Sequence, residues 1–254
     1  MEYEVILKKH QHQDKWSGGK TTQLGIFPKN ADVKKKDFIW RLSTATCKKD
    51  KAKFTDYTGY NRVLIPLEGE VKLEHKPAEG AEGEAAEIRQ TELGEMEQVE
   101  FSGAEKTTAY GLKRDYNLII REDAEYYVDV IDQILAGAGE NADKSVPVGE
   151  NGEASFLPIN AILEGKRVPV RLRHKKGFDH ITQALYCADG FSSVHIEEKQ
   201  VELVTKEEDA PTDIKIIRLT EGDQLILRYR EGEKLKMNIK GAGRLIHCQM
   251  FYNV

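Results

Sequence analysis

The chain has 254 residues, enough to bury a sizeable core, and all-β barrels or sandwiches of this length commonly form one domain. Its 43 acidic and 38 basic residues give a formal net charge of -5, which speaks against duplex nucleic acid as the main partner. Three widely separated cysteines, Cys47, Cys187 and Cys248, do not suggest a disulfide framework and fit a reducing compartment.

The sequence starts with MEYEVILKKHQH, which lacks an apolar stretch of signal-peptide length. No later run approaches the roughly 18 apolar residues that a membrane-spanning helix needs. We therefore expect a cytoplasmic protein with no membrane partner and no nucleic-acid partner.

Alternation of apolar and polar residues predicts short β-strands in the first half of the chain. It covers residues 2–9, 23–27 and 38–46, and the run at 62–67 continues into a hairpin at Glu68-Gly-Glu70. The Gly-rich and Glu-rich run after this hairpin, residues 78–87, predicts a solvated loop.

Two of these predicted strands each carry an arginine away from the bulky face. In residues 38–46 the even positions are bulky, whereas Arg41 and Ser43 share the opposite face. In residues 62–67 the apolar side chains occupy one face, and Arg62 points away from it. Guanidinium groups match carboxylate geometry, so two arginines and a hydroxyl on rigid strands would bind a small anion. Surface or ion-pairing arginines are the alternative.

The second half is a succession of short predicted strands with glycine-marked turns. Residues 126–135 fit a strand or a helix, and residues 137–154 predict a long loop. Turns are expected at Ala188-Asp-Gly190 and Arg230-Glu-Gly232. Many short strands with such turns favour barrels or sandwiches over a parallel α/β sheet. The predicted strands span residues 168–174, 181–187, 194–204, 214–219, 224–229, 235–239 and 244–252.

Six short blocks in the first half resemble, in the same order, those of the HutD/Ves family. In the second half, mainly Glu221-Gly-Asp223 and the terminal strands are similar. Ser17 stands where the family often has Asn, and the segment 123–186 is longer than usual. The six blocks are Trp16-Ser-Gly-Gly-Lys-Thr21, Asp37-Phe-Ile-Trp-Arg-Leu-Ser43, Phe54-Thr55, Tyr57-Thr-Gly-Tyr-Asn-Arg62, Phe101-Ser-Gly103 and Asp115-Tyr-Asn117.

The resemblance and the strand pattern together predict an all-β fold, a cupin-like double β-barrel or sandwich (bicupin). We expect barrels at residues 1–122 and 123–254, the second with an inserted segment, forming one compact unit. The resemblance implies a small carboxylate metabolite, such as formylglutamate or urocanate, as ligand. It also implies a role in moderating histidine utilisation or in a stress response.

The matching motifs imply which residues line the ligand pocket. For Trp16, Trp40 and Phe101 a place in the core is the stronger expectation, because large aromatic side chains are mostly buried for packing. The implied pocket residues are Trp16, Ser17, Gly18, Trp40, Arg41, Ser43, Arg62, Phe101 and Asn117.

The sequence leaves open whether the chain is an enzyme and favours a binding protein. Metal-dependent cupins bring two nearby histidines, a carboxylate and a later histidine onto one ion. The seven histidines show no such spacing, and His75 has no other histidine near it in the sequence, so we expect no metal and no cofactor. No nucleophile with an adjacent base stands out, and we assign no catalytic residue.

Two other functions remain open alternatives. One is a metal-independent isomerase or hydrolase that acts on a small carboxylate. The other is a protein-interaction scaffold without a small-molecule ligand. Cupin-like barrels often pair through their sheets, so analogy suggests a homodimer.

Overall fold

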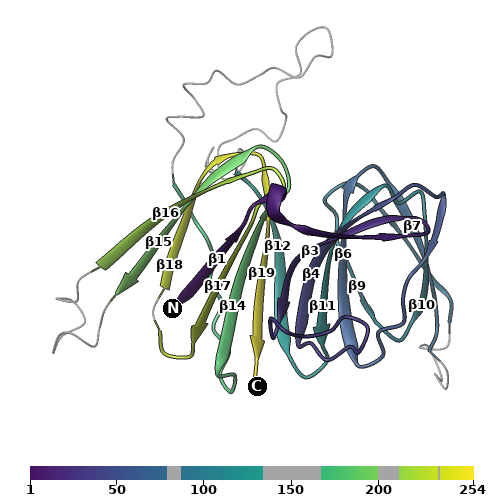
Figure 1. Cartoon of the computed structure of the whole chain (residues 1–254), viewed down its shortest axis with the longest axis horizontal. Helices are drawn as coiled ribbons and strands as arrows, with labels where there is room; N and C mark the ends of the chain where they lie inside the picture. The colour runs from purple at the N-terminus through teal and green to yellow at the C-terminus, as the bar shows by residue number, and fades with distance from the viewer. Residues whose placement is uncertain (79–86, 134–166, 200–211, 234) are drawn as a thin grey trace, which may run out of the picture. The chain divides into compact units, whose positions relative to one another are not determined.

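The computed structural model of the chain is built almost wholly from antiparallel β-strands (Figure 1). Besides strands, its described elements include one short 3-10 helix, η1 (Lys8–His10). Among the described residues, no helix has the length and apolar character that a membrane crossing requires. The structure describes residues 1–78, 87–133, 167–199, 212–233 and 235–254.

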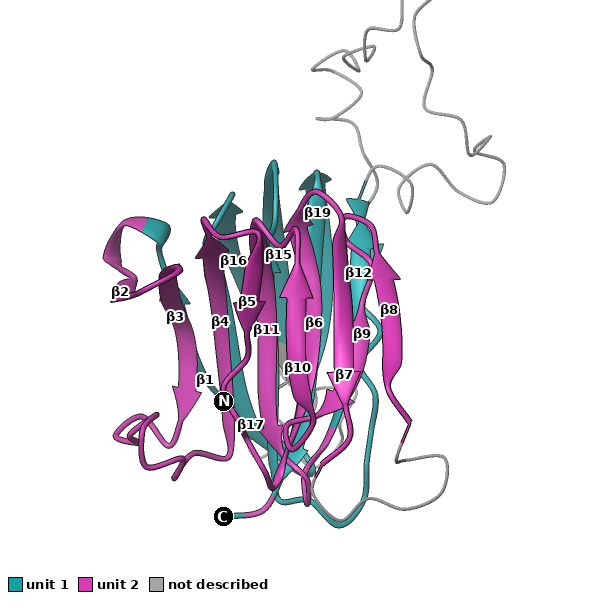
Figure 2. Ribbon diagram, turned by 90° about the vertical axis from the view of Figure 1, so that its right-hand side faces the viewer, with its two compact units in different colours: residues 1–8, 126–252, 254 teal, residues 9–125, 253 magenta. Residues whose placement is uncertain are grey.

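The chain divides into two compact units, coloured separately in Figure 2. Unit 1 contains residues 1–8, 126–252 and 254, and unit 2 contains residues 9–125 and 253. The first strand of the chain thus groups with the C-terminal half. The boundary expected at residue 122 stays a prediction.

Unit 2 is made of two antiparallel sheets, and its first sheet has six strands in the order β2-β3-β4-β11-β6-β9. The second sheet has four strands in the order β5-β10-β7-β8. The strands of the first sheet are β2 (His12–Trp16), β3 (Gly19–Phe27), β4 (Trp40–Cys47), β11 (Arg114–Arg121), β6 (Tyr60–Glu68) and β9 (Val99–Ser102). Those of the second are β5 (Lys51–Lys53), β10 (Lys106–Tyr110), β7 (Val71–Lys76) and β8 (Arg89–Leu93).

The residue pattern explains why the sheets of unit 2 enclose a core. On β7 the side chains alternate, with Val71, Leu73 and His75 buried and the intervening residues more exposed. The central strand β11 is buried on both faces over six consecutive residues, and these include the polar Asp115 and Asn117. The turn expected after β6 is present, with Gly69 at a φ of 74°, but the predicted hairpin is wrong, because β6 and β7 belong to different sheets.

Unit 1 also consists of two antiparallel sheets, of five and four strands. Leucine, isoleucine and valine side chains from both sheets pack into one cluster between them. The five-stranded sheet contains β1 (Glu2–Ile6), β17 (Gln224–Arg230), β14 (His180–Cys187), β19 (Arg244–Tyr252) and β12 (Glu125–Asp132), in this order. The four-stranded sheet contains β13 (Val168–Pro169), β18 (Leu235–Ala242), β15 (Phe191–Lys199) and β16 (Thr212–Thr220).

Several strand predictions differ from the structure at their ends. The ambiguous segment 126–135 contains the strand β12, and the strand expected over 168–174 is reduced to Val168–Pro169. Both sets of turn residues, at Gly190 and Gly232, are present with positive φ angles. Most of the loop expected at residues 78–87 lies outside the described residues, and so does all of the loop expected at residues 137–154.

The turn glycines give a stability prediction, because a methyl group at the two positions meets different surroundings. Gly190 has a φ of 66°, and a Cβ there would lie 2.1 Å from the Ala242 carbonyl oxygen. Gly232 has a φ of 93°, and a Cβ there would meet no atom within 4 Å. Backbone strain should therefore cost about 1 to 2 kcal/mol in either alanine variant, and the clash should cost Gly190→Ala about 1 to 3 kcal/mol more. Urea unfolding measures both, and equal losses would contradict this explanation.

Candidate functional site

The strand register of unit 2 brings the two predicted arginines to opposite sides of one residue. Arg41 on β4 and Arg62 on β6 both pair with Ile119 of the intervening strand β11. Two strand spacings separate the arginine backbones, about 10 Å. Ser43 pairs with Asn117 one step along, so Arg41, Ser43, Arg62 and Asn117 share one face of the sheet. All four are buried, which excludes the alternative of surface arginines.

The guanidinium of Arg62 lies among three aromatic rings. Its Cζ is 4.7 Å from the ring centre of Phe54, 5.2 Å from that of Phe101 and 5.7 Å from that of Tyr57. Such contacts with ring faces stabilise a cation that has left water. Gly103 makes the arrangement possible, because a Cβ there would lie 2.2 Å from the Tyr57 carbonyl oxygen.

Arg62 makes few polar contacts for a buried cation. Nη2 donates to Asn117 Oδ1 at 3.2 Å, and Nη1 donates to the Thr55 carbonyl oxygen at 3.4 Å. Asn117 in turn donates through Nδ2 to Asp115 Oδ2. Arg62 Nε and Asp115 Oδ1 are buried without any hydrogen-bond partner. Buried polar atoms are rarely left unpaired, so these two indicate a place for a ligand or water.

Burial shifts the pKa values of the charged side chains on this face. It lowers the pKa of Arg62 to about 10, against the opposing effect of the Asp115 charge, and it lowers the pKa of Arg41 as well. The same loss of water raises the pKa of Asp115 to about 6, although Asn117 and Arg62 favour its ionised form. The nearby charge of Arg41 adds to the lowering of the Arg62 pKa, so the two guanidinium groups affect each other.

The buried charges of this face do not balance. Among the described residues of unit 2, its buried charged side chains are Arg41, Arg62 and Asp115, besides the imidazole of His75. Two cations thus face one carboxyl group. Burying charge without a partner is unfavourable, so the arrangement suits an additional anion.

Four of the predicted pocket residues lie away from this face. Trp40 points to the opposite face of β4, fully buried, and stacks on Phe27 at 6.0 Å. Trp16, Ser17 and Gly18 form the end of β2 and the turn into β3, where the Trp16 ring lies over Gly18.

The register shows how far this turn is from the arginines. The first residue of β3 pairs with Cys47, four residues beyond Ser43 on β4. That separation is about 13 Å along the strand. Phe101, the remaining pocket prediction, pairs with Arg62 and contacts its guanidinium.

Sequence reasoning missed several members of the buried group. Asp115 stands two residues before Asn117, so strand parity places it on the same face, and that signal was available. Gln23 accepts a hydrogen bond from Arg41 Nε at 3.4 Å, across the β3-β4 pairing. His75 was set aside as a lone histidine. No spacing in the sequence links it to Arg62, because it lies on the other sheet of the unit.

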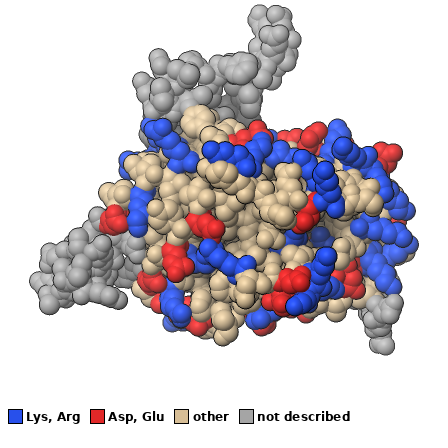
Figure 3. Space-filling model, in the orientation of Figure 1, with Lys and Arg blue, Asp and Glu red and all other residues tan. Residues whose placement is uncertain are grey.

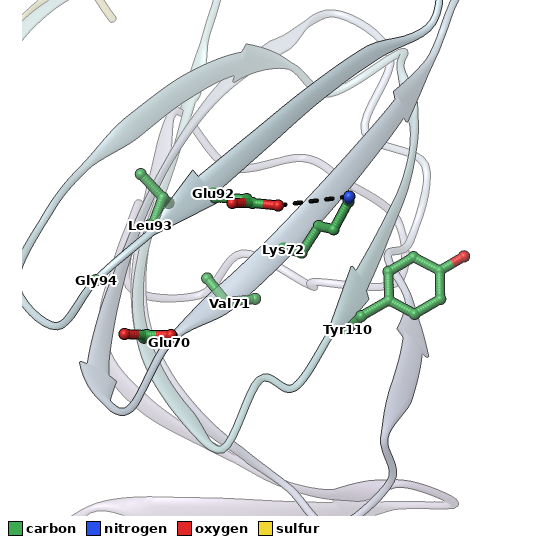
Figure 4. Close-up of a pocket in the computed structure, with 7 residues that line it drawn as sticks. All are labelled: Glu70, Val71, Lys72, Glu92, Leu93, Gly94 and Tyr110. Carbon is green, nitrogen blue, oxygen red and sulfur yellow. Dashed lines mark ion pairs between the residues drawn. The ribbon is translucent and has the colours of Figure 1, made fainter.

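A pocket of about 500 Å³ lies elsewhere in unit 2 (Figure 4). It is formed along β7 and β8, and Lys72 and Glu92 across it form an ion pair at 3.4 Å. None of the pocket residues predicted from the sequence lines it. Its lining residues are Glu70, Val71, Lys72, Glu92, Leu93, Gly94 and Tyr110.

The surface and the other reactive side chains do not offer a comparable site. On the face drawn in Figure 3, acidic and basic side chains are interspersed and do not form an extended area of one sign. Among the described residues, no three His, Cys, Asp or Glu side chains are grouped to hold a metal ion. All three cysteines are free thiols, and burial raises the pKa of Cys187 to about 12, which makes it unreactive.

Two units, each of two facing antiparallel sheets, define a cupin-like all-β protein, as predicted. Solved cupin structures share this fold: oxalate decarboxylase from Lactobacillus farciminis has a TM-score of 0.50 at 10% identity, with 98% of this chain and 86% of that chain covered. A conserved protein of unknown function from Pseudomonas aeruginosa PAO1 has a TM-score of 0.58 at 16% identity, and the match covers 99% of this chain and 98% of that chain.

HutD from Pseudomonas fluorescens SBW25 also has a TM-score of 0.58 at 16% identity, covering 97% of this chain and 98% of that chain. The sequence profile of the HutD family matches residues 8–134. The chain therefore belongs to the HutD family, which confirms the resemblance found in the sequence. A search of curated proteins found no match.

The buried carboxyl group gives a pH prediction. Because the pKa of Asp115 is about 6 in the folded chain and about 4 when unfolded, the folded state binds the proton more tightly. Ionisation of Asp115 therefore lowers stability as the pH rises from about 4 to 6. Asp115→Asn removes this effect, so its stability relative to the original chain should rise over that interval by up to about 3 kcal/mol.

Urea unfolding at pH 4, 5, 6 and 7 measures this difference. The exposed Asp123, which pairs with Arg121, provides the matched control as Asp123→Asn. A difference between Asp115→Asn and the original chain that does not change with pH would contradict the prediction.

Proposed function

We propose that the chain is a metal-free binding protein that holds the carboxylate of a small metabolite against Arg62, inside unit 2. The observation that carries the proposal is the buried Arg62 Nε, a charged donor without a partner. A carboxylate supplies the missing acceptor and the missing negative charge at once.

The existing hydrogen bonds of Arg62 leave room for a stronger partner. Both of its bonded acceptors, on Asn117 and Thr55, are neutral oxygens, and both bonds are long, at 3.2 and 3.4 Å. Bonds between ionised groups are shorter and stronger, particularly where an arginine fork meets a carboxylate. The surrounding rings of Phe54, Tyr57 and Phe101 keep water away and so strengthen the attraction.

Arg41 and Ser43 are proposed as the other polar side of the site. Both lie on the face that carries Asn117, and Arg41 keeps a weak bond to Gln23 at 3.4 Å. The second guanidinium favours a ligand with net negative charge, and the hydroxyl can donate to or accept from it.

Unit 1 carries buried polar side chains as well, some of them paired and some not. Buried atoms of Gln133, Ser192, His195, Gln224 and Arg228 lack a hydrogen-bond partner, but the side chains around Gln183 are hydrogen-bonded to one another. His247 Nε2 lies 2.8 Å from Gln183 Oε1, and Gln183 Nε2 donates to the Tyr229 hydroxyl at 2.8 Å. Gln249 accepts from the Arg173 backbone at 2.8 Å and donates to the Arg171 carbonyl oxygen. These partners satisfy the group without a ligand.

Formate is the simplest probe for the proposed site. The similar HutD from Pseudomonas fluorescens was studied in a formate condition, and the similar oxalate decarboxylase is a formate complex. Larger carboxylates such as formylglutamate and urocanate follow from the family resemblance. A role in histidine utilisation or in a stress response, and pairing as a homodimer, stay predictions.

The test replaces the proposed anion-binding side chain. Arg62→Gln keeps a polar side chain and removes the charge, so the affinity for a bound carboxylate should fall about tenfold or more. Isothermal titration calorimetry with formate, urocanate and formylglutamate measures this. Arg121→Gln, which breaks an exposed ion pair with Asp123, is the matched control and should bind normally. Unchanged affinity in a folded Arg62→Gln variant, or no binding of any carboxylate by the original chain, would show the proposal to be wrong.

A further inference from the structure

A further unpartnered polar atom lies in the interior of unit 2, on the other sheet. His75 on β7 is 1% exposed, and its Nε2 is buried without a hydrogen-bond partner. Its Nδ1 lies 3.0 Å from the Thr107 hydroxyl and 3.1 Å from Glu105 Oε2. Arg89 pairs with the same carboxylate at 3.1 Å, so a chain of charges leads inward to the imidazole.

The neighbours of His75 determine which of its nitrogens carries the proton. The Glu105 carboxylate, which Arg89 also contacts, can only accept hydrogen bonds, so the Nδ1 that lies beside it is the donor. Burial lowers the pKa of His75, and the charges of Arg89 and Arg62 lower it further against the opposing effect of Glu105. The imidazole is therefore neutral near pH 7, and Nε2 is an acceptor.

His75 and Arg62 lie around the same aromatic ring. The Phe101 ring centre is 4.9 Å from that of the His75 imidazole and 5.2 Å from Arg62 Cζ. The charge of Arg62 makes a small contribution to the lowering of the His75 pKa. The interior thus presents an unpartnered donor, Arg62 Nε, and an unpartnered acceptor, His75 Nε2.

We propose that His75 Nε2 is the second recognition point of the carboxylate site, and that it accepts a hydrogen bond from an N–H or O–H group of the ligand. This inference rests on the proposed function. A plain carboxylate has no donor and would leave Nε2 unpaired, which is unfavourable for a buried atom. The preferred ligand class is therefore a small hydroxy acid or a carboxylate with an amide N–H. Glu105 is a positioning residue, because it holds the imidazole with Nε2 free.

The first test compares probes that differ only in the donor. Glycolate is paired with acetate, 3-hydroxypropionate with propionate, and 4-hydroxybutyrate with butyrate, so that the donor is offered at three distances from the carboxylate. Calorimetry with the original chain should give at least one hydroxy acid about two- to tenfold higher affinity than its partner acid. His75→Phe should abolish this preference and keep the affinity for the plain acid. The exposed His12, replaced in His12→Phe, is the matched control on the same unit and should keep the preference.

The second test needs no variant and holds even if His75→Phe fails to fold. Long-range ¹H–¹⁵N NMR correlation distinguishes an imidazole protonated at Nδ1 from one protonated at Nε2. We expect the Nδ1–H form for His75, with an Nε2 signal that moves on adding the preferred hydroxy acid and not on adding its plain partner. Glu105→Leu should increase the fraction of the Nε2–H form.

The outcomes separate this inference from the function on which it rests. Carboxylate binding without any preference for a donor, or an Nε2–H imidazole in the original chain, overturns the role of His75 alone. Failure of every acid to bind overturns the proposed function itself, and the role of His75 with it.

Discussion

The desolvated guanidinium of Arg62 is the constraint around which unit 2 is arranged. A cation inside a β-structure must be compensated, because water no longer solvates it. Three rings, one amide and the Asp115 carboxyl supply part of this compensation. Their placement depends on backbone features far from the charge, such as the close approach of Gly103 to the Tyr57 loop. The compensation is incomplete, and the proposed anion site rests on this.

The two units solve the problem of buried polarity differently. In unit 1 the amide of Gln183 links His247 to Tyr229, and burial lowers the pKa of His247 to about 4, which favours a neutral imidazole in that group. In unit 2 charged groups remain, and polar atoms of Arg62 and His75 lack partners. A fully satisfied network stabilises its fold, whereas an unsatisfied one reduces stability and retains binding capacity.

The alternation of side chains between the two faces of each strand was the most informative signal in the sequence. It has a physical limit, because it describes one strand at a time. It put Arg41 and Ser43 on one face and Arg62 off the bulky face of its own strand, and the β4-β11-β6 pairing brings them together (Figure 1). Asp115 could have been found by the same rule. His75 could not have been found in this way, because it reaches the interior from the second sheet. The alternation of side chains along one strand does not show which residues of another sheet face it. The Trp16–Gly18 turn matched the family motif but lies near the far end of β4.

The sequence by itself determined the all-β class, the glycine turns, the family and the two arginines, because these depend on local alternation, turn chemistry and short motifs. Only the tertiary structure decided that the arginines are buried and incompletely compensated, that Asp115 shares their surroundings, and that His75 has an unpartnered nitrogen near the same ring as Arg62. It also decided that the first strand pairs with β17, more than two hundred residues away. The physical reason is that burial and charge balance are properties of neighbours in space, which strands distant in the sequence supply.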